Sequence, residues 1–180
     1  MITASQIANS YNQANDPDFE ITQTLKSNFA IAKETHLPFY LQLNEFIEIL
    51  KWKLGKQYNR GEKYREENTE EIVHVITQAS FAIAHSDWNY ETDLKIGILC
   101  TLHGVGVPIA SAILALTFPE KYAVIDFRVW RQMFDKPQDT FSVTDYKIYL
   151  SEIKRFSDEL SWQPQQVDRA IWFYDYKKLP

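Results

Sequence analysis

The stretch that decides the fold is LHGVGVPIASAILAL, from Leu102 to Leu116. Two glycines, Gly104 and Gly106, flank one valine between an apolar segment and a segment of small and apolar residues. Glycine permits the backbone conformations of a tight turn between helices, and it leaves no side chain between that turn and a neighbour. We therefore predict a hairpin of two helices at residues 91–117.

The turn also predicts an anion-binding site. The first N–H groups of a helix have no partner inside it and lie at the positive end of its dipole, so they bind phosphate when they are uncovered. We expect the backbone of Gly104, Val105, Gly106 and Val107 to contact DNA, with the Val105 side chain in the core. This arrangement is a helix-hairpin-helix motif. The alternative is a tight turn with no ligand.

Outward from the hairpin the apolar residues recur at helical spacing, and only the very short Tyr122–Ile125 approaches a strand pattern. We expect one all-α, multi-helix domain over residues 1–180, with two helical halves around a cleft. In the helix that follows Asn68, the spacing predicts an apolar stripe of Ile72, Val75, Ile76, Ala79 and Ala82. The other predicted helices cover about 4–14, 18–35, 39–54, 91–102, 107–116, 126–134, 144–156 and 164–176, and residues 56–68 are the longest predicted loop.

Composition excludes several classes of protein. Hydrophobic residues are 45% and charged residues 24% of the 180 positions, as in a globular domain. The single cysteine, Cys100, excludes an internal disulfide and a cluster of four thiolates, and the four histidines show no metal-ligand spacing. We expect no metal and no other cofactor. No signal-peptide pattern and no membrane-spanning stretch occurs, so we expect a cytoplasmic protein that does not enter membranes.

The charge is unevenly distributed. A formal net charge of -5 argues against nucleic-acid binding, yet residues 51–65 contain six basic side chains and one acid, Glu62. We expect Lys53 and Arg60 in this segment to contact DNA phosphate; the alternative is a solvated basic surface. Trp52 either stacks on a base or belongs to the core.

Residues 102–134 resemble the helix-hairpin-helix DNA glycosylase superfamily. In that family the hairpin is followed by a helix, a loop and an aspartate that opens the next helix, in a context similar to VDTHVxR; here Ala123–Arg131 reads AVIDFRVWR. The resemblance implies a DNA-glycosylase-like fold, duplex DNA with a damaged base as partner, and a base flipped into a pocket between the halves. It implies that Asp126 is the catalytic carboxylate, which stabilises positive charge on the sugar. The alternative for Asp126 is a helix N-cap.

The sequence departs from the family at two sites. Members that cleave the DNA strand carry a lysine just after the hairpin glycines, where this chain has Pro108, and many carry an iron–sulfur cluster, which Cys100 alone cannot hold. The resemblance then implies hydrolysis of an N-glycosidic bond without strand cleavage, in a pocket that includes Trp52 and Trp130. We expect Arg128 and Arg131 to bind phosphate or to pair with acidic side chains.

Three functions therefore compete. The first is a monofunctional DNA glycosylase, the second a catalytically inactive relative that binds DNA or a protein, and the third a helical interaction module that never meets nucleic acid. The third is favoured if the hairpin, Asp126 and the basic residues 51–65 do not share one cleft. Near the C-terminus, we expect Trp172 to pack the last helix and Asp168 and Arg169 to make a buried polar contact.

Overall fold

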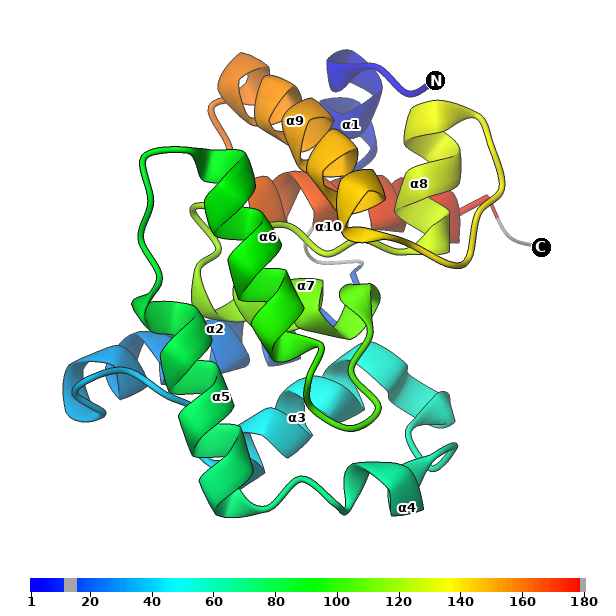
Figure 1. The fold of residues 1–180 in the computed structure, drawn as a ribbon. Coiled ribbons are helices and arrows are strands. Elements are labelled where there is room, and N and C mark those ends of the chain that lie inside the picture. Colours follow the sequence, from blue (N-terminus) through cyan, green and yellow to red (C-terminus); the bar gives the residue numbers. More distant parts are fainter. Residues whose placement is uncertain (12–15, 179–180) are drawn as a thin grey trace.

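The computed structural model of the protein describes residues 1–11 and 16–178 (Figure 1). Regular secondary structure in these ranges is helical, and no β-strand occurs in them, which confirms the all-α prediction. Tyr122–Ile125, the stretch nearest to a strand pattern, belongs to no regular element and is buried. Among the described residues, no helix combines the length and the apolar character needed to cross a bilayer.

The helices form two groups (Figure 1). The half that we call the terminal half joins both ends of the chain, because α1 packs on α9 and α10, and α8 packs on α10. In the other half, called the central half, α7 packs on α2 and α3, and α5 packs on α3 and α6. The terminal half contains α1 (Ala4–Ser10), α8 (Phe127–Phe134), α9 (Val143–Leu160) and α10 (Pro164–Tyr176); the central half contains α2 (Phe19–Thr35), α3 (Leu43–Leu54), the 3-10 turn η2 (Gly55–Gln57), α4 (Glu62–Arg65), α5 (Glu70–Ala82), α6 (Trp88–Leu99) and α7 (Val107–Thr117).

Most predicted helices are present, with shifted ends. The hairpin pair is α6 and α7, and α6 begins earlier than predicted because Asp87 caps its first turn. α9 begins at Val143, because Ser142 caps it. The predicted loop at 56–68 contains part of η2 and all of α4. The first helix ends at Ser10; Tyr11 is not helical, and residues 12–14 of the predicted range lie outside the described residues.

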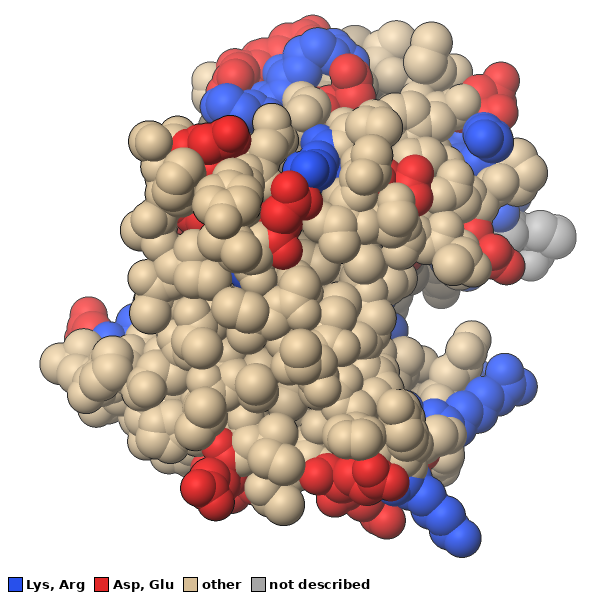
Figure 2. All heavy atoms as spheres, viewed as in Figure 1, with Lys and Arg blue, Asp and Glu red and all other residues tan. Residues whose placement is uncertain are grey.

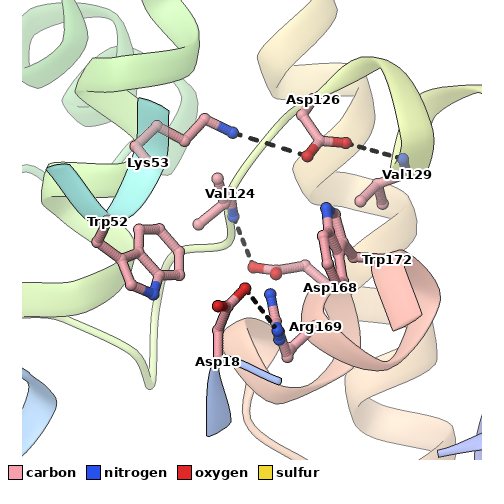
Figure 3. A pocket seen from close by; sticks show the side chains of 9 residues that line it. All are labelled: Asp18, Trp52, Lys53, Val124, Asp126, Val129, Asp168, Arg169 and Trp172. Atoms are coloured by element: carbon pink, nitrogen blue, oxygen red, sulfur yellow. Dashed lines mark hydrogen bonds and ion pairs between the residues drawn. The ribbon is translucent and has the colours of Figure 1, made fainter. Parts of the chain in front are cut away.

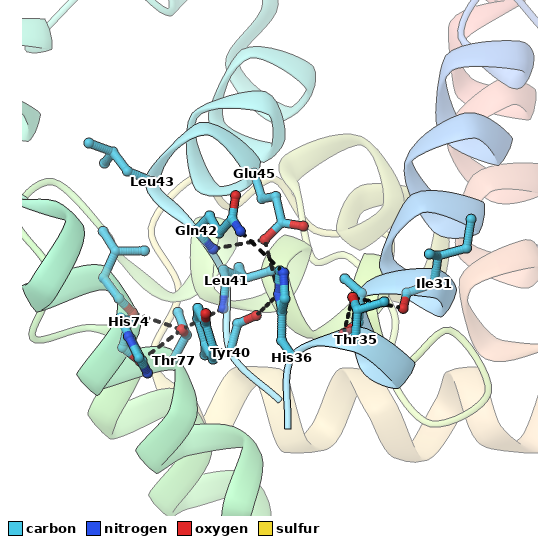
Figure 4. Close-up of polar contacts among 12 residues, drawn as sticks. Ile31, Thr35, His36, Tyr40, Leu41, Gln42, Leu43, Glu45, His74 and Thr77 are labelled. Carbon is cyan, nitrogen blue, oxygen red and sulfur yellow. Dashed lines mark hydrogen bonds and ion pairs between the residues drawn. The ribbon is translucent and has the colours of Figure 1, made fainter. Parts of the chain in front are cut away.

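The predicted apolar stripe of α5 is wrong. Ile72 and Val75 are exposed, and the helix instead buries Val73, Thr77 and Ser80. Thr77 is buried because its hydroxyl accepts a hydrogen bond from the N–H of Leu41 at 2.9 Å, which docks the segment before α3 (Figure 4). Polar docking of a neighbouring backbone therefore decides which face of α5 points inward.

Two of the histidines stack on one tyrosine at the same junction (Figure 4). The ring centroids of Tyr40 and His74 are 3.7 Å apart, and those of His36 and Tyr40 are 4.7 Å apart. His36 also lies 3.9 Å from Glu45. Among the described residues, no group of three or more His, Cys, Asp or Glu side chains is arranged to hold a metal ion.

The basic segment folds onto the hairpin. Asn68, buried just before α5, donates to the carbonyls of Arg65 and His103 at 2.9 Å each and accepts from the N–H of His103 at 2.8 Å. Gly104 has a φ of +74°, and a Cβ there would lie 2.6 Å from the Cγ of Arg65. The hairpin turn therefore requires glycine at 104, and it is held against α4.

We predict that Asn68→Ala lowers the free energy of unfolding by about 1–3 kcal/mol, because it removes the partner of the partly buried N–H and C=O of His103. Urea denaturation followed by circular dichroism measures this. The matched control is Asn59→Ala, since the Asn59 side chain is exposed; it should change stability by less than about 0.5 kcal/mol. Equal losses in the two variants would contradict the role of Asn68 as a clamp.

Candidate functional site

The extended segment Tyr122–Ile125 positions the candidate site. It is buried and outside any sheet, so its backbone needs partners from elsewhere. Side chains of four helices supply them. The Val124 N–H donates to Asp168 Oδ2 at 2.6 Å, and the Ile125 N–H donates to Ser111 Oγ at 3.1 Å. The three carbonyls accept from side chains: that of Ala123 from Tyr146 at 3.0 Å, that of Val124 from Tyr149 at 2.9 Å, and that of Ile125 from Lys53 at 3.3 Å.

Asp126 follows this segment and uses its two carboxylate oxygens differently. Oδ1 accepts from the N–H groups of Arg128 at 2.9 Å and Val129 at 3.0 Å, which makes Asp126 the N-cap of α8. Oδ2 lies 3.8 Å from the Nζ of Lys53, which comes from α3 in the central half (Figure 3). The cap therefore fixes the carboxylate and leaves one oxygen directed at a cation.

A small cavity lies beside this ion pair, between the two halves. Its lining comes from the start of α2, the end of α3, the segment before α8, and α10 (Figure 3). Its volume is about 80 Å³, room for a few water molecules and well below the roughly 300 Å³ at which small-molecule pockets begin. A larger ligand can enter only if the halves separate or side chains turn aside.

Two tryptophans border the cavity from opposite halves. Trp52 on α3 donates from Nε1 to Thr22 Oγ1 at 2.9 Å and is half-buried. Trp172 on α10 is also half-buried. Figure 3 shows the carboxyl group of Asp168 and the side chain of Val124 between them. The Trp172 ring is itself packed: the Arg169 Cζ lies 4.1 Å from its centroid, and Tyr176 stacks on it with the two centroids 5.2 Å apart.

Asp168 is the second carboxyl group of the cavity, and its environment differs from that of Asp126. Burial raises its pKa well above the ordinary value; the hydrogen bond from Val124 lowers the pKa by less, and the nearby Asp126 charge raises it further. Arg169, its neighbour in sequence, donates instead to Asp16 and Asp18. Asp168 therefore retains its proton to a higher pH than a solvated aspartate does.

The N-terminus of the hairpin helix has uncovered donors. Gly106 is the N-cap of α7, and its carbonyl accepts from Ile109 and Ala110. Within the part of the chain that the structure describes, the N–H groups of Gly106 and Val107 make no hydrogen bond. Val105 is buried, as predicted. Ser111, on the next turn of α7, accepts a hydrogen bond from the N–H of Ile125, so the hairpin helix is bound to the residue just before Asp126.

The predicted site residues Arg128, Arg131 and Trp130 lie elsewhere. Both arginines pair with the buried Asp175 of α10, Arg128 at 3.1 Å and Arg131 through two bonds of 2.5 and 2.6 Å. Trp130 does not line the cavity: it is 6% exposed and packs against Phe134 and Phe141. The helical twist explains this, because Trp130 is on the face of α8 that turns into the terminal half.

The basic residues 51–65 are divided by the fold. Lys53 points into the cavity, and Arg65 donates to the carbonyls of Tyr58 and Arg60. The remaining ones, Lys51, Lys56, Arg60 and Lys63, are exposed. Figure 2 shows the surface hollowed between the halves, with basic side chains on the lower rim, where α4 lies in Figure 1.

From the sequence, Asp126 was assigned to catalysis, Trp52 to the base pocket and Lys53 to DNA phosphate, whereas Asp168 and Trp172 received only structural roles. These last two are four residues apart, so they lie on one face of α10. Comparison of the chain with known family models, curated proteins and solved structures gives no match. Function therefore has to be argued from the geometry of the cavity.

The two buried aspartates of α10 predict opposite pH dependences. The pKa of Asp168 is raised, so its contribution to stability is present below its unfolded value and is lost as the pH rises through the folded value. Burial alone would raise the pKa of Asp175, but Arg131, Gln132 and Arg128 lower it overall, so its contribution is present above its unfolded value and is lost as the pH falls.

We predict that Asp168→Asn becomes more stable relative to the wild type as the pH rises from 4 to 8. Asp175→Asn should be less stable by about 1–3 kcal/mol at pH 7, because two partly exposed arginines lose the carboxylate that accepts their hydrogen bonds, and that deficit should shrink toward pH 3. Urea denaturation across this pH range measures both. A stability difference for Asp168→Asn that does not change with pH would contradict the raised pKa of Asp168.

Proposed function

We propose that this protein binds duplex DNA through its helix-hairpin-helix turn and hydrolyses the N-glycosidic bond of a base flipped into the cavity between the halves. The observation that carries the proposal is the position of Asp126. The carboxylate is fixed by its cap, faces Lys53 and borders a cavity lined by two tryptophans.

The chemistry follows from the charge that develops in the reaction. Breaking an N-glycosidic bond leaves positive charge on the sugar, and a fixed carboxylate beside that carbon stabilises it and orients the attacking water. A base extruded from the duplex needs aromatic surfaces to replace its stacking. Trp52 borders the cavity from the central half, and Trp172 can stack on a base only when Arg169 turns aside from its ring. Because the cavity holds about 80 Å³, it must widen when a base enters.

The shared location of the predicted elements argues against a module that never meets nucleic acid. Lys53 of the basic segment contacts Asp126, Arg65 packs on Gly104, and Ser111 of the hairpin helix binds the segment before Asp126. Free N–H groups at the hairpin and exposed cations on the rim of the hollow suit a phosphate backbone.

A second candidate is a DNA-binding protein without catalysis. The small size of the cavity and the ion pair of Asp126 Oδ2 with Lys53 favour it. It has the same contacts with phosphate and differs only in the absence of base release.

We predict that Asp126→Asn lowers the rate of base release by about 100-fold or more and leaves DNA affinity unchanged, because asparagine caps a helix as well as aspartate does. A panel of duplexes with single damaged bases, followed by mass spectrometry of released bases, measures the rate. The matched control is Asp87→Asn, since Asp87 caps α6 through the same two kinds of contact. Undiminished release in Asp126→Asn would contradict the catalytic role. Absence of release from every duplex, with binding intact, would favour the second candidate.

We predict that the protein binds a duplex with an abasic-site analogue more tightly than the undamaged duplex, and that affinity falls steeply with salt. Joint replacement of Arg60 and Lys63 by Gln should reduce the salt slope, by about 0.9 for each phosphate contact removed. The control with the same charge change is Lys154→Gln with Arg155→Gln on α9, where both side chains pair with acids of their own helix. Equal slopes in the two double variants would place the phosphate contacts elsewhere.

A further inference from the structure

The apolar stripe of α5 is exposed, although its spacing is that of a helix face buried against a partner. Ile72 is 40% exposed and Val75 is 55% exposed. Ala79 and Ala82 continue the stripe toward the end of the helix and are exposed as well, and Ile76 is half-buried. Single apolar residues are ordinary on a protein surface, whereas a contiguous apolar patch marks an interaction site. About three turns of α5 therefore present an apolar surface to solvent.

α6 packs on α5 and has an exposed glycine in its middle. A Cβ at Gly97 would meet no described atom within 4 Å, so the packing of the described residues does not require glycine there. Glycine inside a helix is destabilising relative to alanine, but it allows another backbone to approach closely. Leu94 and Ile98, beside it on α6, are half-buried. A helix from outside the chain, packed against this point, would account for Gly97.

The charges around this surface are acidic. Residues 66–94 contain seven side-chain carboxylates and no lysine or arginine. Four of the carboxylates are exposed at the start of α5 or just before it: those of Glu66, Glu67, Glu70 and Glu71. Figure 2 shows that the surface over α5 and α6 is largely free of charged side chains, with acidic ones at its lower edge. A complementary partner therefore has apolar residues at the centre of its contact surface and cations at the edge.

We propose that the exposed sides of α5 and α6 bind an amphipathic helix of another protein, in which lysine or arginine flanks an apolar stripe. A helix suits the surface because its apolar residues recur at intervals of three and four, as Ile72, Val75 and Ala79 do. Gly97 is the point at which the two backbones approach most closely. The proposal is independent of the proposed function, because none of these residues lines the cavity beside Asp126.

A second copy of this chain is a poorer occupant. A twofold dimer pairs one surface patch with the same patch of its partner. Residues 66–101 contain one lysine and no arginine, and that lysine, Lys95, is buried and donates to the carbonyls of Ser80 and Phe81. The patch therefore has no exposed lysine or arginine to place against its own carboxylates.

Two labelled synthetic peptides test the proposal. The first has about 14 residues, enough to span α5, with leucine on one helical face and lysine on the others; the second has glutamate in place of lysine. Fluorescence anisotropy measures the affinity of each. We expect the wild type to bind the lysine peptide at least about 10-fold more tightly, because only its charges complement the exposed carboxylates. Equal affinities, or no binding of either peptide, would overturn the proposal.

Gly97→Gln separates binding from folding. The new side chain enters open space and replaces a glycine inside a helix, so we expect the urea midpoint of unfolding to rise. The same side chain obstructs the closest approach of a partner helix, so the lysine peptide should bind at least about 10-fold more weakly. A variant that is more stable and binds as the wild type does would contradict the proposed contact.

A pair of double variants tests the contribution of α5. Ile72→Ser with Val75→Ser removes two side chains of the stripe, and it should weaken binding of the lysine peptide. Ile31→Ser with Ile148→Ser removes two side chains of similar exposure from α2 and α9, and it should not. Equal weakening in both would mean that the peptide binds no particular surface. Sedimentation velocity completes the test: a wild-type dimer that Gly97→Gln converts to a monomer would assign the surface to a second copy and overturn the proposal.

Discussion

The structure depends on the hydrogen bonds that side chains make to the backbone of four buried residues outside any helix. The segment Tyr122–Ile125 would cost several kilocalories per mole if its N–H and C=O groups were buried without partners. Side chains from α3, α7, α9 and α10 bind them instead, so one stretch of backbone joins the central and terminal halves. Asp126 is the first residue after this segment, so the contacts that hold the segment also fix the position of Asp126.

The same contacts explain why polar residues gather at the cavity. Asp168 and Lys53 are there because Val124 N–H needs an acceptor and Ile125 C=O needs a donor. These hydrogen bonds place the Asp168 carboxyl group and the Lys53 ammonium at the cavity, where both can act on a ligand. Burial raises the pKa of Asp168, whereas Asp126 faces a cation. Charged side chains that bind the buried backbone groups thus form a candidate reaction centre at the same place.

Local features could be predicted from the sequence, and long-range ones could not. The glycines of the hairpin and the capping aspartate act within a few residues, so the turn and the start of α8 were evident at Gly104, Gly106 and Asp126. The contact of Lys53 with Asp126 joins positions 73 residues apart, and no sequence pattern predicts it. Helical spacing also predicted the wrong buried face of α5. Spacing considers apolar residues alone, whereas Thr77 is buried because it accepts a hydrogen bond from the backbone of Leu41.

The pairing of α1 with α9 and α10 has a consequence for biosynthesis. The central half is one continuous run of chain, so it can fold while the ribosome is still translating. α1 is translated before α9 and α10, so its packing is complete only after both have left the exit tunnel. The apolar face of α1, which includes the fully buried Ile7, is therefore exposed until then. This interval is when the nascent protein has most need of a chaperone.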